Sequence, residues 1–358
     1  MNKVDSPALV VDEAIVAENI RLAIEMIGEV DRLRPHVKTH KMGEVCRLMM
    51  EQGITRFKCA TIAEAEMLAM VGAPDVLLAY QPVGVKVERL LNLVAAYPVT
   101  RFSCLLDSAE HACAINEWVG KTPFSLDVFI DLNVGMNRTG ARPLQAIDLA
   151  RRLRSLKHLR LTGLHGYDGH IHDTDLALRQ QAADVAFAEL DKVYQAVQPW
   201  CAYPLKRVAG GTPTFPIHAR RPGVECSPGT FVFWDWGYGQ AFPDMPFQYA
   251  AWLLCRVVSV IDERRICLDL GYKAVASENP LPRVHYIYTP EVIPVAQSEE
   301  HLVAETPDSR LYPLGSTLYG LPTHICPTVA LYEKAFVVRG QELISTWRIQ
   351  ARDRCITI

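Results

Sequence analysis

Short apolar runs alternate with longer amphipathic segments over the first two thirds of the chain. This alternation of strand-like and helix-like patterns predicts an α/β architecture built on a parallel sheet. The helical pattern is clearest at 62–71 and 174–197, where strong helix formers recur at helical spacing. The predicted strands of this region cover 32–40, 56–61, 75–82, 99–107, 125–133, 159–167, 206–211 and 224–233.

Eight strands joined by crossover connections predict a (β/α)8 barrel of the TIM type, with an open doubly wound sheet as the alternative. After about residue 245 the pattern changes to strand-like runs without long helices between them. A strand at 8–11 and a helix near 13–27 precede the barrel. We therefore predict a barrel domain over 13–245 and a mostly β domain formed by 1–12 and 246–358.

Composition narrows the class of protein. Of the 358 residues, 49% are hydrophobic and 22% charged, which excludes a disordered, collagen-like or coiled-coil chain. The formal net charge of −3 provides no general basic surface, so we expect neither nucleic acid nor a membrane as a partner. The chain starts without a signal-peptide pattern, and its ten cysteines are scattered without a C-x-x-C motif. We expect a cytoplasmic protein without structural disulfides.

The most informative segment is the basic run RPHVKTHK at 34–41. In a strand, alternate residues share a face, so Arg34, His36, Lys38 and His40 would project from one side of the first barrel strand. Inside a barrel these basic groups require anionic compensation, which a phosphorylated cofactor would supply. Lys38 then offers an amine for covalent attachment of that cofactor. The alternative is a solvated basic edge strand.

Glycine-rich turns follow several of the later strands. Residues 131–140, DLNVGMNRTG, follow the fifth predicted strand and contain Arg138, whose planar guanidinium suits binding of an anionic oxygen pair. The sequence AGGTPT ends the seventh strand, and PGT lies beside the eighth. Because barrel phosphate sites favour the loops after strands seven and eight, these turns predict a phosphate site. The alternative for each turn is an ordinary end of a strand.

Two histidine motifs suggest metals. His324 and Cys326 would point to the same face of an extended segment, where one imidazole and one thiolate could bind Zn²⁺ with open positions. An isolated pair of this kind is more often coincidence. His170 and His172 suggest a metallohydrolase pair instead, but further ligands are missing and the lysine segment would then have no purpose.

The segment RPHVKTHK closely resembles the cofactor-lysine segment of the D-threonine aldolase and D-serine dehydratase family. These enzymes bind pyridoxal 5′-phosphate (PLP) in an alanine racemase-type barrel. The resemblance implies that Lys38 carries the cofactor covalently, with Lys38, Arg138 and Tyr167 as the catalytic residues. It implies a role for Tyr167 in packing on the pyridine ring and for His165 near the ring nitrogen. The implied cofactor-binding set is His36, Lys38, Arg138, His165, Tyr167, Gly210, Gly211, Thr212, Gly229 and Thr230.

The same resemblance turns His324 and Cys326 into a metal site that lines the active centre. D-threonine aldolases typically have His-x-Asp at this place, and vertebrate-type D-serine dehydratases have His-x-Cys. The cysteine of this chain favours zinc over manganese.

The expected function is a metal-assisted, PLP-dependent lyase acting on D-3-hydroxy amino acids. We place D-threonine aldolase cleavage to glycine and an aldehyde first, with D-serine dehydratase as the alternative. An amino acid racemase, which needs a second base, and a non-catalytic PLP-binding protein also stay open. From the resemblance we expect a homodimer whose active sites are shared between subunits.

Overall fold

A computed structural model describes residues 4–340 and 342–358 of the chain. The chain divides into two compact units, which are treated separately below. We name them by content: the barrel unit comprises Ala23–Lys38, Cys46–Gly229 and Asp353–Ile358, and the β unit comprises Met1–Leu22, Thr39–Val45 and Thr230–Arg352. The predicted domain limits at residues 12 and 245 stay a prediction.

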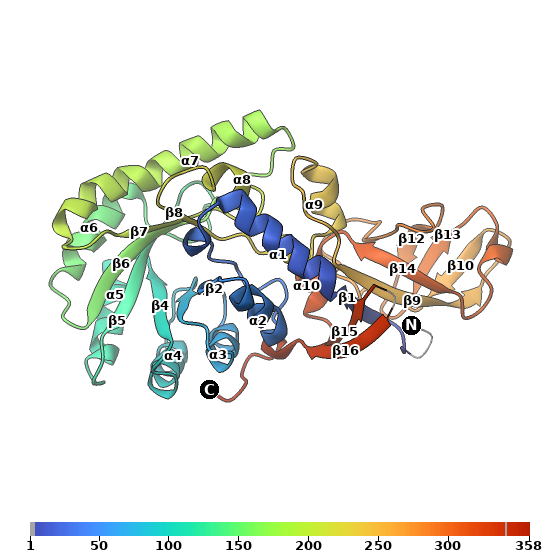
Figure 1. Cartoon of the computed structure of the whole chain (residues 1–358), viewed down its shortest axis with the longest axis horizontal. Coiled ribbons are helices and arrows are strands. Elements are labelled where there is room, and N and C mark those ends of the chain that lie inside the picture. The colour runs from blue at the N-terminus through green and yellow to red at the C-terminus, as the bar shows by residue number, and fades with distance from the viewer. Residues whose placement is uncertain (1–3, 341) are drawn as a thin grey trace. The chain divides into compact units, whose positions relative to one another are not determined.

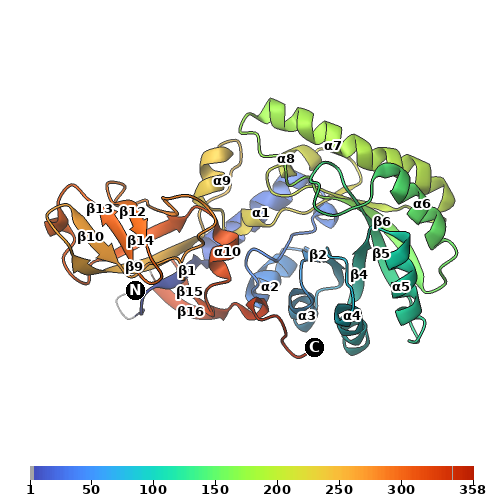
Figure 2. The ribbon, with the colours of Figure 1, turned by 180° about the vertical axis from the view of Figure 1, so that it is seen from behind.

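The barrel unit contains a sheet of seven strands, all parallel and ordered as in the sequence. The helices of this unit follow the outer face of the curved sheet, as Figures 1 and 2 show from opposite sides. The strands are β2 (Arg56–Cys59), β3 (Asp75–Leu78), β4 (Arg101–Leu106), β5 (Leu126–Leu132), β6 (Leu159–Gly166), β7 (Lys206–Ala209) and β8 (Val224–Cys226). The helices are α2 (Gly43–Glu51), α3 (Ile62–Met70), α4 (Val85–Ala96), α5 (Ala109–Val119), α6 (Pro143–Leu153), α7 (Leu176–Val197) and α8 (Phe215–His218). Helix α1 (Glu13–Ile27) and the start of α2 belong partly to the β unit.

The predicted first strand at 32–40 is wrong in its regular form. The chain instead makes a short 3₁₀ helix, Val30–Arg32, then isolated parallel bridges from Leu33 to Cys226 and from His36 to Lys58. Pro35 has no N–H to give, which interrupts a continuous ladder, and its carbonyl accepts from Lys58 N at 2.8 Å. Segment 33–37 therefore fills the place between β8 and β2, and the barrel fold class is confirmed with its first strand reduced to bridges.

The predicted common face of four basic residues is wrong for the same reason. The Arg34 guanidinium is fully buried and pairs with Asp75 and Glu225, each at 2.6 Å. His40 lies in a turn assigned to the β unit, where its ring packs edge-on against Phe233. Arg34 is thus neutralised by carboxylates of its own unit, not by a cofactor.

Charged pairs occupy the amino-terminal ends of the parallel strands. Asp75 and Lys206, the first residues of β3 and β7, pair at 2.9 Å. Asp127 of β5 accepts from both Arg101 and Arg160 at 2.5 Å. These networks close one end of the sheet, so room for chemistry lies at the carboxyl ends of the strands, as it does in known parallel barrels.

The predicted helices at 62–71 and 174–197 correspond to α3 and α7, and their starts follow from side-chain caps. The Thr61 hydroxyl accepts from Glu64 N, and the Asp175 carboxylate accepts from Leu178 N. Such caps satisfy backbone donors that have no partner within the helix.

The β unit is built on a nine-stranded sheet in which β1 and β15 pair in parallel and the other pairs are antiparallel. The predicted mostly β region is confirmed, and it contains an unpredicted strand at Ile293–Gln297 (β12). In the barrel unit, the strand predicted at 224–233 is shorter, because β8 ends at Cys226. The strands are β1 (Ala8–Asp12), β9 (Ala251–Val260), β10 (Arg265–Leu268), β11 (Val284–Tyr286), β12 (Ile293–Gln297), β13 (Leu302–Glu305), β14 (Thr317–Pro322), β15 (Lys334–Arg339) and β16 (Glu342–Arg348). Two short helices, α9 (Trp236–Ala241) and α10 (Ile325–Val329), also belong to this unit.

Two expectations concern the whole chain. Among the described residues, no helix is long and apolar enough to cross a bilayer. All ten cysteines lie in the described part of the chain, and none of them forms a disulfide there.

Candidate active site

Three basic side chains surround the ring of Tyr167 in the barrel unit. The Nζ atoms of Lys38 and Lys58 each lie 5.7 Å from the ring centroid, and the Arg138 guanidinium carbon lies at 5.1 Å. Lys58 comes from β2, Arg138 from the turn after β5, and Tyr167 from the residue after β6. The parallel strands bring these groups to the carboxyl end of the sheet, where Lys38 follows the bridging segment.

Two glycines leave the room that the Tyr167 ring occupies. A Cβ atom at Gly169 would lie 2.3 Å from the ring, and one at Gly211 would lie 3.0 Å from it. Any side chain at Gly169 would therefore displace the ring, whereas Gly211 forms a close wall beside it. The ring position follows from the sequences YDG at 167–169 and GGT at 210–212.

Arg138 lies in a turn that holds its own shape. The Asn133 side-chain oxygen accepts from the backbone N–H groups of Gly135 and Asn137, both at 3.1 Å. The next residue, Thr139, donates its hydroxyl to Asp131 at 2.9 Å. Local bonds of this kind fix the backbone on both sides of Arg138 without contributions from its guanidinium.

A buried chain of hydrogen bonds runs from β5 through β6 to β2. The carboxylate of Asp131 bonds His165 Nδ1 at 2.7 Å, and His165 Nε2 lies 3.5 Å from Lys58 Nζ. Burial lowers the pKa of His165, so the ring is neutral, donates through Nδ1 to Asp131 and accepts at Nε2. His165, which is predicted to lie near the pyridine nitrogen, turns its Nε2 atom toward Lys58 in this structure.

Lys58 was not among the predicted site residues. It is 2% exposed, and burial, together with the charge of nearby Lys38, lowers its pKa to about 7. The available signal was a lysine between Phe57 and Cys59 in a short apolar strand, because a central parallel strand is buried on both faces.

The predicted phosphate loop after β7 rests on a buried carboxylate. Asp168 accepts from the Thr214 hydroxyl at 2.9 Å and bonds His218 Nε2 at 2.8 Å. Thr214 in turn accepts from Gly211 N at 3.3 Å, while Gly210 adopts a φ of 77°, which favours glycine.

Backbone N–H groups of the predicted phosphate-binding turns after β7 and β8 already have partners within these turns. Gly229 N donates to the Thr212 hydroxyl at 3.0 Å, as Gly211 N donates to Thr214. A phosphate oxygen is a stronger, charged acceptor and could replace such a rotatable hydroxyl. The loop therefore fits an anion, and its role in binding phosphate stays a prediction.

His36 and Thr230, two further predicted cofactor-binding residues, have contacts within their own units. His36 Nδ1 accepts from Lys38 N at 3.2 Å, which holds the backbone just before the lysine. Thr230 belongs to the β unit, where its hydroxyl lies 3.5 Å from the Cys326 sulfur.

The predicted metal pair lies in the β unit, but its backbone is not extended throughout. His324 is the residue just before helix α10, and Cys326 lies in the first turn of that helix. The correction follows from the helix start, where Asp235 accepts from Ile325 N at 3.0 Å. Among the described residues, no group of three or more histidine, cysteine or acidic side chains is arranged to hold a metal.

Cys326 and His324 nevertheless have polar surroundings. The Cys326 sulfur lies 3.1 Å from the Thr39 hydroxyl, and His324 Nδ1 bonds Glu278 at 2.6 Å. Burial opposes protonation of His324, but Cys326 and nearby carboxylates raise its pKa to about 9. The bond to Glu278 leaves Nε2 as the nitrogen that would bind a metal.

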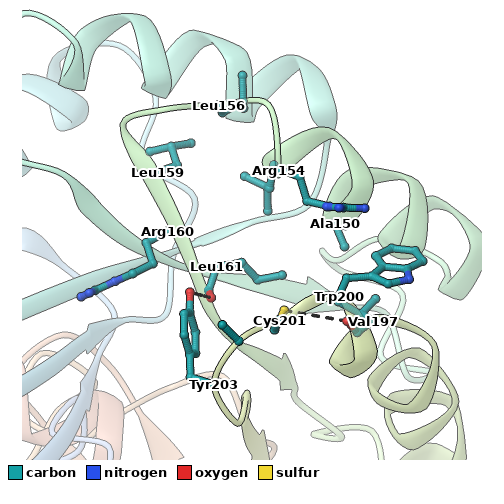
Figure 3. A pocket seen from close by; sticks show the side chains of 12 residues that line it. Ala150, Arg154, Leu156, Leu159, Arg160, Leu161, Val197, Trp200, Cys201 and Tyr203 are labelled. Atoms are coloured by element: carbon teal, nitrogen blue, oxygen red, sulfur yellow. Dashed lines mark hydrogen bonds between the residues drawn. The ribbon is translucent and has the colours of Figure 1, made fainter.

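A separate cavity lies at the opposite end of the sheet in the barrel unit. It is lined by the end of α6 with Arg154, the first residues of β6, the end of α7, and the segment that follows α7 with Trp200 and Tyr203 (Figure 3). The Tyr203 hydroxyl donates to Leu161 O at 2.8 Å across it. Because this is the amino-terminal end of the strands, it is not the end at which barrel active sites form.

The fold and the groups around Tyr167 define a class of barrel protein with a lysine and anion-binding donors at the carboxyl end of its sheet. The family model described as "Alanine racemase, N-terminal domain" matches residues 11–233. This chain belongs to that family. A second model, described as a serine dehydratase domain, matches residues 250–338.

Curated relatives extend the match over nearly the whole chain. A D-threonine aldolase from Arthrobacter sp is 27% identical over 359 residues, covering 98% of this chain and 93% of the relative. A D-threo-3-hydroxyaspartate dehydratase from Delftia sp. is 26% identical and covers 96% of each chain. The crystal structure of D-threonine aldolase from Filomicrobium marinum matches with a TM-score of 0.90 and 25% identity, covering 98% of this chain and 97% of that one.

Proposed function

We propose that the protein is a PLP-dependent lyase acting on D-3-hydroxy amino acids, with cleavage to glycine and an aldehyde as the leading outcome. The observation that carries the proposal is the grouping of Lys38, Lys58 and Arg138 around Tyr167. PLP is an aldehyde with an anionic phosphate and an acidic phenol, so it requires an amine and a cationic pocket. The relatives named aldolase and dehydratase support the same class of reaction.

The residues present fit this coenzyme. Lys38 is half-buried, and Gly211 lies close beside the Tyr167 ring. When bound, PLP supplies an electron sink for negative charge at the substrate Cα. Lys38 would hold the coenzyme, Arg138 would bind an anionic oxygen and Tyr167 would pack against the ring.

A metal ion is the second group that the proposal includes. One imidazole and one thiolate, from His324 and Cys326, suit zinc better than manganese. Such an ion would supply a Lewis acid for a hydroxyl group. Thr39, whose hydroxyl contacts Cys326, directly follows Lys38 in the chain.

D-Serine dehydratase activity is the second candidate, and Cys326 is the observation that favours it. In that reaction the α-proton and the β-hydroxyl leave, which yields a 2-oxo acid and ammonia. In the aldolase reaction the β-hydroxyl loses its proton and the Cα–Cβ bond breaks. The position of the base relative to these two protons decides between the outcomes.

Products formed from D-threonine distinguish the candidates. The protein is incubated with PLP, zinc and D-threonine, and both product pairs are quantified. Glycine with acetaldehyde supports the aldolase, and 2-oxobutanoate with ammonia supports the dehydratase. Racemised threonine without new products would identify a racemase. No turnover of D-threonine, D-serine or D-3-hydroxyaspartate, with coenzyme bound, would contradict the proposed lyase.

A further inference from the structure

Lys58 is a buried amine that lacks a carboxylate partner of its own. Among the described residues, no acidic side chain lies within ion-pair distance of Lys58 Nζ, and its one hydrogen-bond contact is neutral His165. A buried ammonium without a counterion is strongly unfavourable. This contrasts with Arg34, which is equally buried but has two carboxylates.

The nearest carboxylates are committed to other groups. Asp131 bonds His165 through one oxygen, and its other oxygen accepts from Thr139 and from Gln81, both at 2.9 Å. Asp168 is shared between Thr214 and His218. Neither carboxylate can approach Lys58 without giving up bonds of its own.

Charged groups around Lys58 influence whether its amine carries a proton. The cations Arg34, from the bridging segment, and Lys38, which follows it, disfavour an ammonium at Lys58, and Arg138 from the turn after β5 lies at the same Tyr167 ring. The carboxylates of Asp131 and Asp168 favour it, but each is engaged in a hydrogen bond with a histidine, His165 or His218. Burial and the cations together outweigh the two carboxylates, and they lower the pKa of Lys58 to about 7.

We propose that Lys58 is a proton acceptor of the coenzyme site, a largely neutral amine in the coenzyme-free protein that becomes an ammonium when the phosphorylated anion binds. The arriving negative charge is the counterion that the protein itself does not supply. The proton comes from the buffer, it ends on Nζ, and no covalent bond to carbon changes. Asp131 and His165 act as positioning residues, because they hold the acceptor nitrogen against which Nζ rests.

This inference rests on the proposed function, because it requires that PLP binds here. Its consequence is thermodynamic: binding of the coenzyme near neutral pH takes up protons, and the affinity falls as the pH rises above the pKa of Lys58 in the coenzyme-free state. A lysine that merely fills space in the barrel would not link binding to protons.

Calorimetry tests the linkage directly. The probe is 4′-deoxypyridoxine 5′-phosphate, which carries the ring and phosphate but no aldehyde, so covalent attachment contributes no protons. Titrations at pH 8 in buffers of different ionisation enthalpy give the number of protons taken up. We expect wild type to take up close to one proton per site more than Lys58→Met. Lys192→Met removes an exposed lysine of α7 and should match wild type.

Lys58→Arg provides a second comparison, because an arginine stays cationic at every accessible pH. It should lose the extra proton uptake but keep its affinity at pH 8, whereas Lys58→Met should lose about tenfold in affinity. Equal proton uptake in wild type and in either variant would overturn the inference while leaving PLP binding intact. Failure of wild type to bind both the analogue and PLP would instead contradict the proposed function.

Discussion

At the level of a single residue, Asp168 connects the loop after β6 to the predicted phosphate loop after β7. Its carboxylate holds the Thr214 hydroxyl and His218, and Thr214 accepts from Gly211 N in the predicted phosphate loop. The residue was not predicted, because an acidic side chain in a loop after a strand has many ordinary roles. Its contacts support the loop without reaching the Tyr167 ring.

Asp168→Asn tests this support. An amide offers only one acceptor oxygen and no charge, so Thr214 or His218 loses part of its partner, at a cost of about 1–3 kcal/mol. We expect PLP affinity, measured by absorbance titration, to fall about tenfold. Asp173→Asn is the control, because Asp173 is exposed and lies, like Asp168, in the loop after β6. Unchanged affinity in Asp168→Asn would show that the loop does not depend on this carboxylate.

Lys58 makes a second prediction at this scale, on the stability of the coenzyme-free protein. Its pKa is about 7 in the folded protein and 10.5 in an unfolded chain, so the unfolded chain binds more protons between these values. The free energy of unfolding therefore rises as the pH rises from about 7 to 10.5. Below about pH 7 both states carry the proton, so Lys58 adds no further pH dependence there. Urea unfolding midpoints measured from pH 6.5 to 10 should show this rise.

In Lys58→Met the same midpoints should be higher at pH 7 and depend less on pH, because no buried ammonium has to form. The Lys192→Met variant should follow wild type. A midpoint for Lys58→Met that is lower than wild type at pH 7, with an unchanged slope, would mean that the amine stabilises the barrel.

At the level of elements, the bridging segment 33–37 closes the parallel sheet through isolated backbone hydrogen bonds and one buried network of ion pairs. Arg34 N donates to Cys226 O and His36 N to Pro228 O, both at 2.9 Å. The Arg34 guanidinium joins Asp75 of β3 to Glu225 of β8. These bonds replace the ladder that a regular first strand would have formed.

Arg34→Met tests how strongly the segment depends on this network. It leaves two acidic side chains without their buried cation, and we expect a loss of about 3–5 kcal/mol in the free energy of unfolding. Arg151→Met is the matched control, because Arg151 pairs with Asp148 on the surface of α6. That exposed pair should contribute less than about 1 kcal/mol. Similar losses in the two variants would contradict the closing role of Arg34.

The elements also show where sequence patterns suffice. Apolar runs predicted the seven later barrel strands because those strands are buried on both faces. The first strand failed because Pro35 cannot donate to a ladder, and this weakens any inference from alternate residues. β12 was missed because most of its residues are exposed, so its apolar signal is weak.

The candidate site likewise contains residues that the sequence predicted and one that it missed. Lys38, Arg138 and Tyr167 were predicted and lie around one ring. Lys58 was missed because the sequence does not show which side of β2 faces the sheet interior or which carboxylates are already engaged. Such information depends on contacts between strands distant in sequence.

At the scale of the whole molecule, the proposed reaction includes a metal ion that His324 and Cys326 of the β unit would bind. We expect chelator treatment to abolish lyase activity and added zinc to restore it. The Cys326→Ala variant should lose that restoration while PLP stays bound, as judged by absorbance. Full activity after chelation would contradict a metal role for this pair.

A homodimer, expected from the family resemblance, predicts twice the chain mass of 40.0 kDa in light scattering.

The central claim is that Lys38 carries the coenzyme, and chemical trapping tests it most directly. The purified protein is treated with PLP and borohydride, digested, and mapped by mass spectrometry. The account predicts one reduced phosphopyridoxyl group on the peptide that contains Lys38, and its loss in Lys38→Ala. Specific labelling of another lysine in the wild-type protein, with Lys38 unmodified, would contradict it.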